Sequence, residues 1–293
     1  MTAVEQFAYG WITPALAFAL SLLGCLLGTF LTSRSRASTG GSRARWLTVS
    51  ALGIGGAGTW VAHFMAMLGV DVPRTVVRYD ILTTALGFGI AVVVYCLGLY
   101  IVGFGRPSTW KILPAGVLTG IGVTAVYATG PLSMRAAGTI AYDSRTLLAA
   151  ACAAIIGSAV TLWCACVVRG NAAMLCASVI MAVAVCCTHY TVMAAVRVEP
   201  AAGVAIAAPV PGVSLFAMLT PVCVLACVLL SVLAYSTVGF SVRQDTADEE
   251  ALLRRARDMY SVATLARAAE HRRVQKEKDK ERDRGVATVP SRS

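Results

Sequence analysis

The sequence predicts an all-α fold: a polytopic membrane bundle of seven transmembrane helices followed by a charged tail. The 293 residues are 57% hydrophobic and only 14% charged, whereas a soluble domain carries about 25% charged residues. The charges are also unevenly distributed, because residues 241–293 hold 13 of the 25 basic and 10 of the 15 acidic residues. We therefore expect a membrane domain over 1–240 and a cytosolic tail, helical or disordered, over 241–293.

Seven apolar windows are long enough to cross a bilayer, which takes about 20 residues. They lie at 12–32, 46–68, 81–104, 112–133, 146–168, 173–196 and 214–240. The first window is not expected to be a cleaved signal peptide, since Glu5 precedes it and no basic residue does. All ten cysteines fall inside these windows, where a thiol behaves as a small apolar group. A disulfide framework is therefore not expected.

The loops between the windows predict the orientation of the chain. One set of alternate loops holds seven basic residues and no acid: Arg34, Arg36, Arg43, Arg45, Arg106, Lys111 and Arg169. The other set, with the N-terminus, holds five basic and five acidic residues. Because basic loops stay on the cytoplasmic side, we expect the N-terminus outside and the C-terminus in the cytoplasm.

Two of the three histidines lie near the outer ends of predicted spans. His63 is followed four residues later by Met67, and His189 is followed four residues later by Met193. Residues i and i+4 share one face of a helix, so each span presents an imidazole and a thioether together. An imidazole in hydrocarbon is costly unless it has a partner or a function. The two histidines therefore mark a candidate site.

A third segment at the same topological position extends this pattern into a repeat. Tyr127 lies almost midway in the sequence between His63 and His189, and Met134 follows it on the same helical face. A period of two spans preserves the orientation of each unit. The spacing therefore predicts three parallel helix-pair repeats plus one extra helix.

The three segments resemble the motifs of the MHYT domain family, in which Met-His-Tyr-Thr-like motifs lie at the outer ends of alternate transmembrane helices. They read Ala62-His63-Phe64-Met65-Ala66-Met67, Val126-Tyr127-Ala128-Thr129-Gly130-Pro131 and Thr188-His189-Tyr190-Thr191-Val192-Met193. The resemblance implies a sensor of the bacterial inner membrane that binds copper and responds to oxygen, carbon monoxide, nitric oxide or redox state. In this family such domains are often fused to output domains that make or degrade cyclic di-GMP.

Imidazole nitrogen and methionine sulfur together suit copper, because Cu(I) prefers soft ligands. The expected copper site consists of His63, Met67, His189 and Met193, with Tyr127 or Met134 facing it from the second repeat. Tyrosine at the position of the second histidine removes one imidazole and is a poor Cu(I) ligand. The alternative is that both histidines are polar contacts between helices, with the methionines as packing residues.

The tail suggests a route to a partner. Residues 248–270 place apolar side chains at helical intervals, which predicts an amphipathic cytosolic helix that contacts a signalling partner or a second copy of the chain. The alternative is a charged extension that contacts anionic lipid. His271 belongs to the solvated stretch that follows. A basic folded face for nucleic acid is missing.

A sensor is the favoured function, and two other classes stay open. A transporter of copper or a small solute would need polar groups through both leaflets, and a metal-free structural membrane protein would need no site. No enzyme activity is expected, because the sequence contains no Ser-His-Asp set, paired carboxylates or phosphate loop. The segment after Phe240 is also too short for a catalytic domain of typical size.

Overall fold

The computed structural model describes most of the chain. The described residues are 2–3, 7–71, 77–104, 108–135, 138–200, 211–214 and 216–239, with isolated positions between 252 and 278. Contacts between residues divide the chain into two units, Met1–Thr237 and Val238–Ser293. The first unit contains the helical bundle and every residue of the predicted site.

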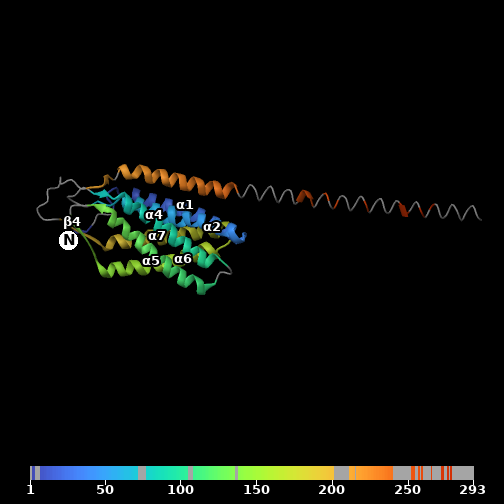
Figure 1. The fold of residues 1–293 in the computed structure, drawn as a ribbon, viewed down its shortest axis with the longest axis horizontal. Helices are drawn as coiled ribbons and strands as arrows, with labels where there is room; N and C mark the ends of the chain where they lie inside the picture. Colours follow the sequence, from blue (N-terminus) through green and yellow to red (C-terminus); the bar gives the residue numbers. More distant parts are fainter. Residues whose placement is uncertain are drawn as a thin grey trace, which may run out of the picture. The chain divides into compact units, whose positions relative to one another are not determined.

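Six described helices are long and apolar enough to cross a membrane. They are α1 (Ile12–Arg36), α4 (Ile81–Gly103), α5 (Thr109–Ser133), α6 (Ser144–Val167), α7 (Asn171–Ala195) and a last helix, Phe216–Gly239. Helices α4 to α7 pack in sequence order, and α1 packs against α7. Figure 1 shows these helices side by side, with β4 at one end of the bundle. The predicted all-α polytopic bundle is confirmed.

The second predicted span is a continuous helical run made of three parts. These are α2 (Gly40–Ala51), the π-helix η1 (Leu52–Val61) and α3 (Ala62–Met67). The backbone is helical at both junctions, with φ −62° and ψ −37° at Leu52 and φ −62° and ψ −43° at Ala62. A helical segment thus occurs at each of the seven predicted places. The number of membrane crossings stays a prediction, because six helices meet the length and hydropathy requirement singly.

Glycines allow this run to pack closely on α1. A Cβ on Gly53 would lie 2.9 Å from the Cα of Gly28, and a Cβ on Gly24 would overlap the backbone nitrogen of Gly58. Gly24 and Gly28 have the i, i+4 spacing that lets membrane helices approach to backbone contact. The close contact continues along the π-helix toward α3, and so it helps to position His63.

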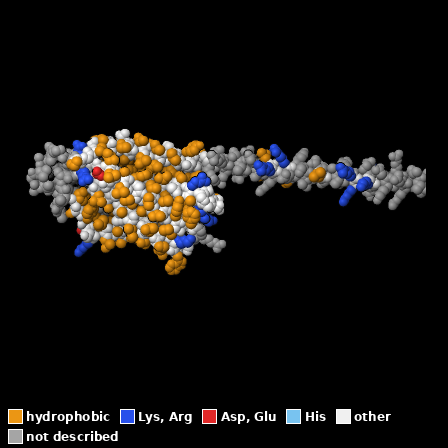
Figure 2. All heavy atoms as spheres, in the orientation of Figure 1, with side chains coloured by type: hydrophobic (Ala, Val, Ile, Leu, Met, Phe, Trp, Pro, Cys, Tyr) orange, Lys and Arg blue, Asp and Glu red, His pale blue; other side chains and the backbone are white. Residues whose placement is uncertain are grey.

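The surface of the bundle is apolar along its length. Figure 2 shows hydrophobic side chains over the visible side of the bundle and Lys and Arg side chains toward its ends. Leu82, Ile121 and Phe216 are 79%, 60% and 72% exposed. Contiguous apolar surface of this extent is unfavourable in water and suits lipid. The protein is a multi-pass membrane protein.

Two small antiparallel sheets, which the sequence analysis did not predict, connect the helices at one end. One sheet has the order β1 (Thr2–Ala3), β5 (Val196–Pro200), β4 (Gly138–Tyr142), and the other β3 (Met134–Arg135), β2 (Arg78–Tyr79), β6 (Val213–Ser214). β3 and β5 directly follow α5 and α7. Four of the six described strands have only two residues, which is too short for an alternation of apolar residues to be recognised in the sequence.

The returning helices of the first two repeats begin with the same cap. Asp80 accepts hydrogen bonds from the backbone N–H and the hydroxyl of Thr83 at the start of α4, and Asp143 accepts the same pair from Thr146 at the start of α6. The pKa of each capping carboxyl lies below its ordinary value. The largest cause is the hydrogen bond from the threonine hydroxyl, and the second is the hydrogen bond from the threonine N–H. In the third repeat the hydroxyl of Ser214 accepts from the N–H of Ala217.

Arginines of the basic loops contact helix ends at the opposite side of the bundle. The guanidinium group of Arg36 donates to the carbonyls of Ala165 and Val168 at the end of α6, and Arg34 donates to the carbonyl of Thr237. Cations are favourable at helix C-termini. These residues therefore stabilise the ends of helices.

Little of the tail is described. The described positions of the tail are helical and exposed. They are 252–254, 257, 259, 265, 272, 273, 276 and 278. The rest of the predicted amphipathic helix at 248–270, and His271, lie outside the described residues. The expected partner contact of the tail therefore stays a prediction.

Candidate metal centre

The structure brings His63 and His189 into direct contact. Nδ1 of His63, on α3, lies 2.7 Å from Nδ1 of His189, on α7, and the ring centroids are 4.8 Å apart. Each residue is only 2% exposed. At this distance one nitrogen carries the proton and donates it to the lone pair of the other. Two residues 126 positions apart in sequence thus form one buried pair.

The outer nitrogens of the pair lack a protein partner. Among the described residues, neither Nε2 of His63 nor Nε2 of His189 makes a hydrogen bond, and the same holds for the hydroxyl of Tyr190. Leaving a buried polar atom unpaired costs about 1–3 kcal/mol, and such atoms commonly bind water or an ion. These three atoms are therefore candidates for contact with a bound species.

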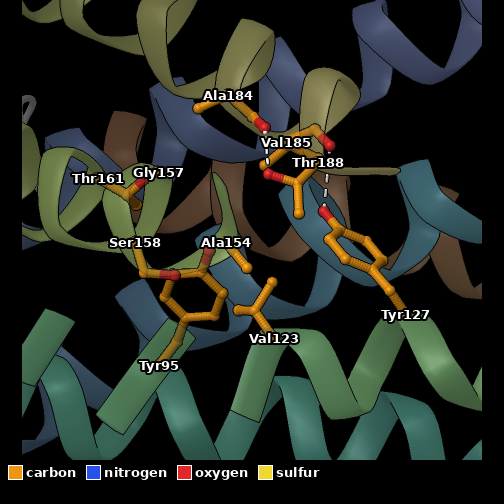
Figure 3. Close-up of a pocket in the computed structure, with 10 residues that line it drawn as sticks. All are labelled: Tyr95, Val123, Tyr127, Ala154, Gly157, Ser158, Thr161, Ala184, Val185 and Thr188. Carbon is orange, nitrogen blue, oxygen red and sulfur yellow. Dashed lines mark hydrogen bonds between the residues drawn. The ribbon is translucent and has the colours of Figure 1, made fainter. Parts of the chain in front are cut away.

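Tyr127 lies beside the pair and has its own partner. Its ring centroid is 4.8 Å from that of His63 and 6.1 Å from that of His189. Its hydroxyl donates to the backbone carbonyl of Val185 on α7 at 3.2 Å, as Figure 3 shows. The side chain is fully buried. The hydroxyl thus connects α5 to α7 within the protein and is not directed to the imidazole pair as a ligand.

The methionines of the predicted site are buried in one apolar cluster. Met67, Met134 and Met193 are 1%, 5% and 1% exposed and belong to the same cluster, which also contains Trp60 and Phe64. All three lie toward the ends of the helices that carry the motifs. The sulfur of Met67 approaches Gly130 on α5.

Gly130, which the sequence analysis did not select, is the point where α5 meets His63. A Cβ at this position would lie 2.6 Å from Nε2 of His63 and 3.3 Å from Sδ of Met67. Only a residue without a side chain lets α5 pack this closely against the imidazole and the thioether. The available signal was its place in the second motif, directly before Pro131 and one turn after Tyr127.

A small cavity borders both imidazoles of the pair. Its volume is about 10 Å³. Its wall comes from α1, α3 and α7 and consists of Ala17, Ala62, His63, Ala66, Val185, Cys186, His189 and Tyr190. Cys186 thus shares the cavity with His189, as its position one turn earlier suggests. Phe7 stacks on Tyr190, with ring centroids 5.6 Å apart.

A second cavity of similar size lies across Val185, which borders both cavities. Figure 3 shows its wall, which includes the side chains of Tyr95, Tyr127, Ser158 and Thr188. Tyr95 makes side-chain hydrogen bonds to Thr59 and Ser158, and Thr188 donates to the carbonyl of Ala184. The hydroxyl groups of this second cavity are therefore largely paired within the protein, in contrast to the outer nitrogens of the imidazole pair.

The donor set decides which ions would fit. Among the described residues there is no cluster of three or more His, Cys, Asp and Glu side chains that could hold a metal. Zinc sites usually have four such ligands, and calcium and magnesium need oxygen ligands. Two imidazoles with nearby thioethers match the preferences of Cu(I). The unpaired Nε2 atoms are compatible with that ion.

Comparison with known proteins identifies the repeat. Residues 56–116 match the family model MHYT, described as a bacterial signalling protein N terminal repeat. This match confirms the resemblance to the MHYT domain family over that segment. The matched segment contains the His63 motif and the returning helix α4, which together form the first of the predicted helix pairs.

Two signalling proteins are similar to this chain. An uncharacterized signaling protein of Caulobacter vibrioides is 27% identical over 190 residues, which cover 65% of this chain and 23% of the relative. The bifunctional diguanylate cyclase/cyclic di-GMP phosphodiesterase MucR of Pseudomonas aeruginosa is 25% identical over 195 residues, which cover 65% of this chain and 28% of the relative. The matches thus span about a quarter of each relative. No solved structure matches the chain.

Proposed function

We propose that this protein is a sensor module of the bacterial inner membrane that binds copper near the outer face. The bound copper would report oxygen, carbon monoxide, nitric oxide or redox state. The observation that carries the proposal is the buried imidazole pair, whose Nε2 atoms have no hydrogen-bond partner among the described residues. The match of residues 56–116 to a signalling-protein repeat and the relatives named as signalling proteins support a sensor rather than a purely structural role.

The residues that would hold copper come from the first and third motifs. His63 and His189 supply imidazole nitrogen, and Met67 and Met193 supply thioether sulfur, a combination suited to Cu(I). Copper, when bound, supplies a redox-active centre that accepts a diatomic ligand. The protein excludes water from it, since all four side chains are at most 2% exposed. Tyr127 contributes a wall, because its hydroxyl is bonded to Val185.

The distribution of charge supports an orientation with the imidazole pair toward the outside. The opposite end of the bundle carries Arg34 and Arg36 on α1 and the other basic residues of the acid-free loops. Basic loops remain in the cytoplasm. We therefore place the N-terminus outside and the C-terminus inside.

The signal would reach the cytoplasm through the tail, 241–293, to a partner or to a second copy of the chain. MucR is named as a cyclase and phosphodiesterase of cyclic di-GMP. We propose that the signal of this chain likewise controls the synthesis or degradation of cyclic di-GMP. The chain itself is proposed to act without catalysis.

Copper content of the purified protein tests the proposal. The full chain in detergent should hold copper, His63→Ala with His189→Ala should hold none, and Cys187→Ala should match the wild type. Cys187 is the matched control because it is exposed and lies on the same helix as His189. Equal copper in the wild type and the double variant would overturn the proposal. Copper flux into sealed vesicles containing the protein would favour a transporter instead.

A further inference from the structure

Three arginines meet around the end of α6, at the side of the bundle that carries the acid-free loops. The guanidinium group of Arg36, the last residue of α1, donates to two backbone carbonyls at the end of α6, at 3.1 Å and 3.0 Å. Arg36 also lies close enough to Arg169, in the loop after α6, for the two charges to repel. The buried thiol of Cys166 interacts electrostatically with both Arg36 and Arg43, which lies in the first turn of α2. Arg36, Arg43 and Arg169 thus form one arginine cluster.

The positive charge of the arginine cluster exceeds the negative charge that residues 1–240 place near it. All five acidic residues of 1–240 lie in the N-terminal segment or in the other set of loops, which also holds the ion pair between Arg135 and Asp80. The end of α6 offers only about half a negative charge, against three guanidinium groups. Bonding to the helix end therefore leaves most of the charge of the cluster without compensation.

One donor of the cluster is buried and unpaired. Nε of Arg43 makes no hydrogen bond to any described residue, which is costly for a charged group. The first N–H groups of α2 are beside it in the sequence, and the side chain of Thr39 does not cap them. A helix N-terminus favours anions, and a guanidinium group matches the oxygens of a phosphate. The donors around Arg43 therefore indicate an anion, and phosphate in particular.

The place of the cluster in the bundle indicates where such a phosphate comes from. Trp46 follows Arg43 by about one turn of α2, and tryptophan is enriched at the level of lipid headgroups. Arg36 and Arg43 are partly buried, whereas Arg169 is exposed. Basic pockets between membrane helices on the cytoplasmic side bind anionic headgroups. Figure 2 shows Lys and Arg side chains at the end of the bundle where Figure 1 labels α2.

We propose that the arginine cluster binds the phosphate group of an anionic phospholipid. Nε of Arg43 donates to a phosphate oxygen, Arg36 bridges the headgroup and the end of α6, and Arg169 adds exposed positive charge. The site lies at the start of the continuous helical run of α2, η1 and α3, which ends beside His63. A bound lipid would therefore join the start of this run to α1 and α6. The proposal needs no copper, so the failure of the copper site would leave it intact.

Titration of the full chain with lipid tests the site. The protein in lipid-free detergent is titrated with phosphatidylglycerol or phosphatidylcholine, and bound lipid is counted by native mass spectrometry. We expect the anionic lipid to bind at least about fivefold more tightly than the zwitterionic one. Arg43→Gln should weaken binding of phosphatidylglycerol by about fivefold, or about 1 kcal/mol, the range for one arginine at a membrane surface.

A matched variant controls for the loss of charge alone. Arg145→Gln removes an exposed arginine from the other end of α6 and should leave the affinity for phosphatidylglycerol unchanged. Thermal unfolding without lipid shows whether each variant folds. Arg169→Gln, in a loop, provides a second variant with the same expected loss if Arg43→Gln does not fold. Equal affinity for both lipids, or wild-type affinity in a folded Arg43→Gln or Arg169→Gln variant, would overturn the proposal.

Two further measurements exclude other occupants of the cluster. Inorganic phosphate at the concentration of the lipid should not displace phosphatidylglycerol, and displacement would assign the site to a free anion instead. The acidic run of the tail is neutralised in the full chain by Asp248→Asn, Glu249→Gln and Glu250→Gln. We expect this triple variant to bind phosphatidylglycerol as the wild type does. A rise in its affinity of about fivefold or more would show that the tail occupies the cluster, and would overturn the assignment to lipid.

Discussion

The second motif and the two histidine motifs occupy equivalent places in the repeat, but their polar groups differ in their hydrogen-bond partners. On α5 the hydroxyl of Tyr127 donates to the carbonyl of Val185, so its polar atom is paired within the protein. On α3 and α7 the imidazoles pair with each other through Nδ1 and leave both Nε2 atoms unpaired among the described residues. The difference separates a polar residue that joins helices from polar residues that can receive a ligand.

Restoring the missing histidine should have the largest effect. In Tyr127→His an imidazole would replace a ring that lies 4.8 Å from that of His63. We expect Cu(I) affinity to rise by at least about tenfold, or about 1.4 kcal/mol, measured by competition with a chromophoric chelator. Unchanged or weaker affinity would show that α5 cannot supply a ligand. The difference between the second motif and the histidine motifs would then come from the position of the α5 backbone and not from the type of residue.

Removing only the hydroxyl of Tyr127 should affect stability and leave copper in place. Tyr127→Phe loses the bond between α5 and α7, and buried hydrogen bonds between membrane helices are worth about 0.6 kcal/mol on average and up to about 1.7 kcal/mol. The expected result is a lower unfolding temperature in detergent with copper content per chain unchanged. Loss of copper in this variant would show that the hydroxyl contributes to the site after all.

The hydroxyl of Tyr190 provides the opposite case within the third motif. It is unpaired among the described residues, so Tyr190→Phe removes no hydrogen bond that the structure describes and keeps the stacked ring of Phe7. We expect the unfolding free energy to stay within about 0.5 kcal/mol of the wild type. A larger loss, in the range predicted for Tyr127→Phe, would mean that the hydroxyl is satisfied through a bound water.

The helix caps of the repeats predict a pH dependence of the stability of the protein. This is the smallest of the expected effects. The pKa values of Asp80 and Asp143 are lowered in the folded protein by hydrogen bonds from Thr83 and Thr146. Their contribution to stability is therefore present above the ordinary aspartate pKa of 3.8 and is lost as the pH falls through the lower folded values. Unfolding temperatures should thus fall below a pH of about 4.

A double variant separates these caps from other acid effects. Asp80→Asn with Asp143→Asn should remove most of this pH dependence. The third cap, Ser214, does not titrate and offers the matched control variant Ser214→Ala. If Ser214→Ala flattens the pH dependence as much as the double variant does, the capping carboxylates are not its source.

Some parts of the site followed from sequence pattern and others did not. The i, i+4 spacing identified His63 with Met67 and His189 with Met193, and the nearly even spacing of the three motifs placed Tyr127 with them. The contact between the two Nδ1 atoms and the close packing of His63 against Gly130 depend on how α3, α5 and α7 rotate against each other. The spacing of residues within one helix does not determine that rotation. In the sequence, a glycine that is required for close packing of two helices cannot be distinguished from any other glycine in a membrane helix.

The sequence by itself determined the membrane class, the helical segments, the charge asymmetry between the loops and the resemblance to the MHYT domain family. These properties follow from the length of apolar runs and from local periodicity, which each segment carries alone. Only the tertiary structure decided that the imidazoles meet, that the hydroxyl of Tyr127 is already bonded, and that short strands join the helix ends. The reason is physical: pairing of buried polar atoms depends on distances between segments that are far apart in the sequence, and these distances exist only once the helices have packed.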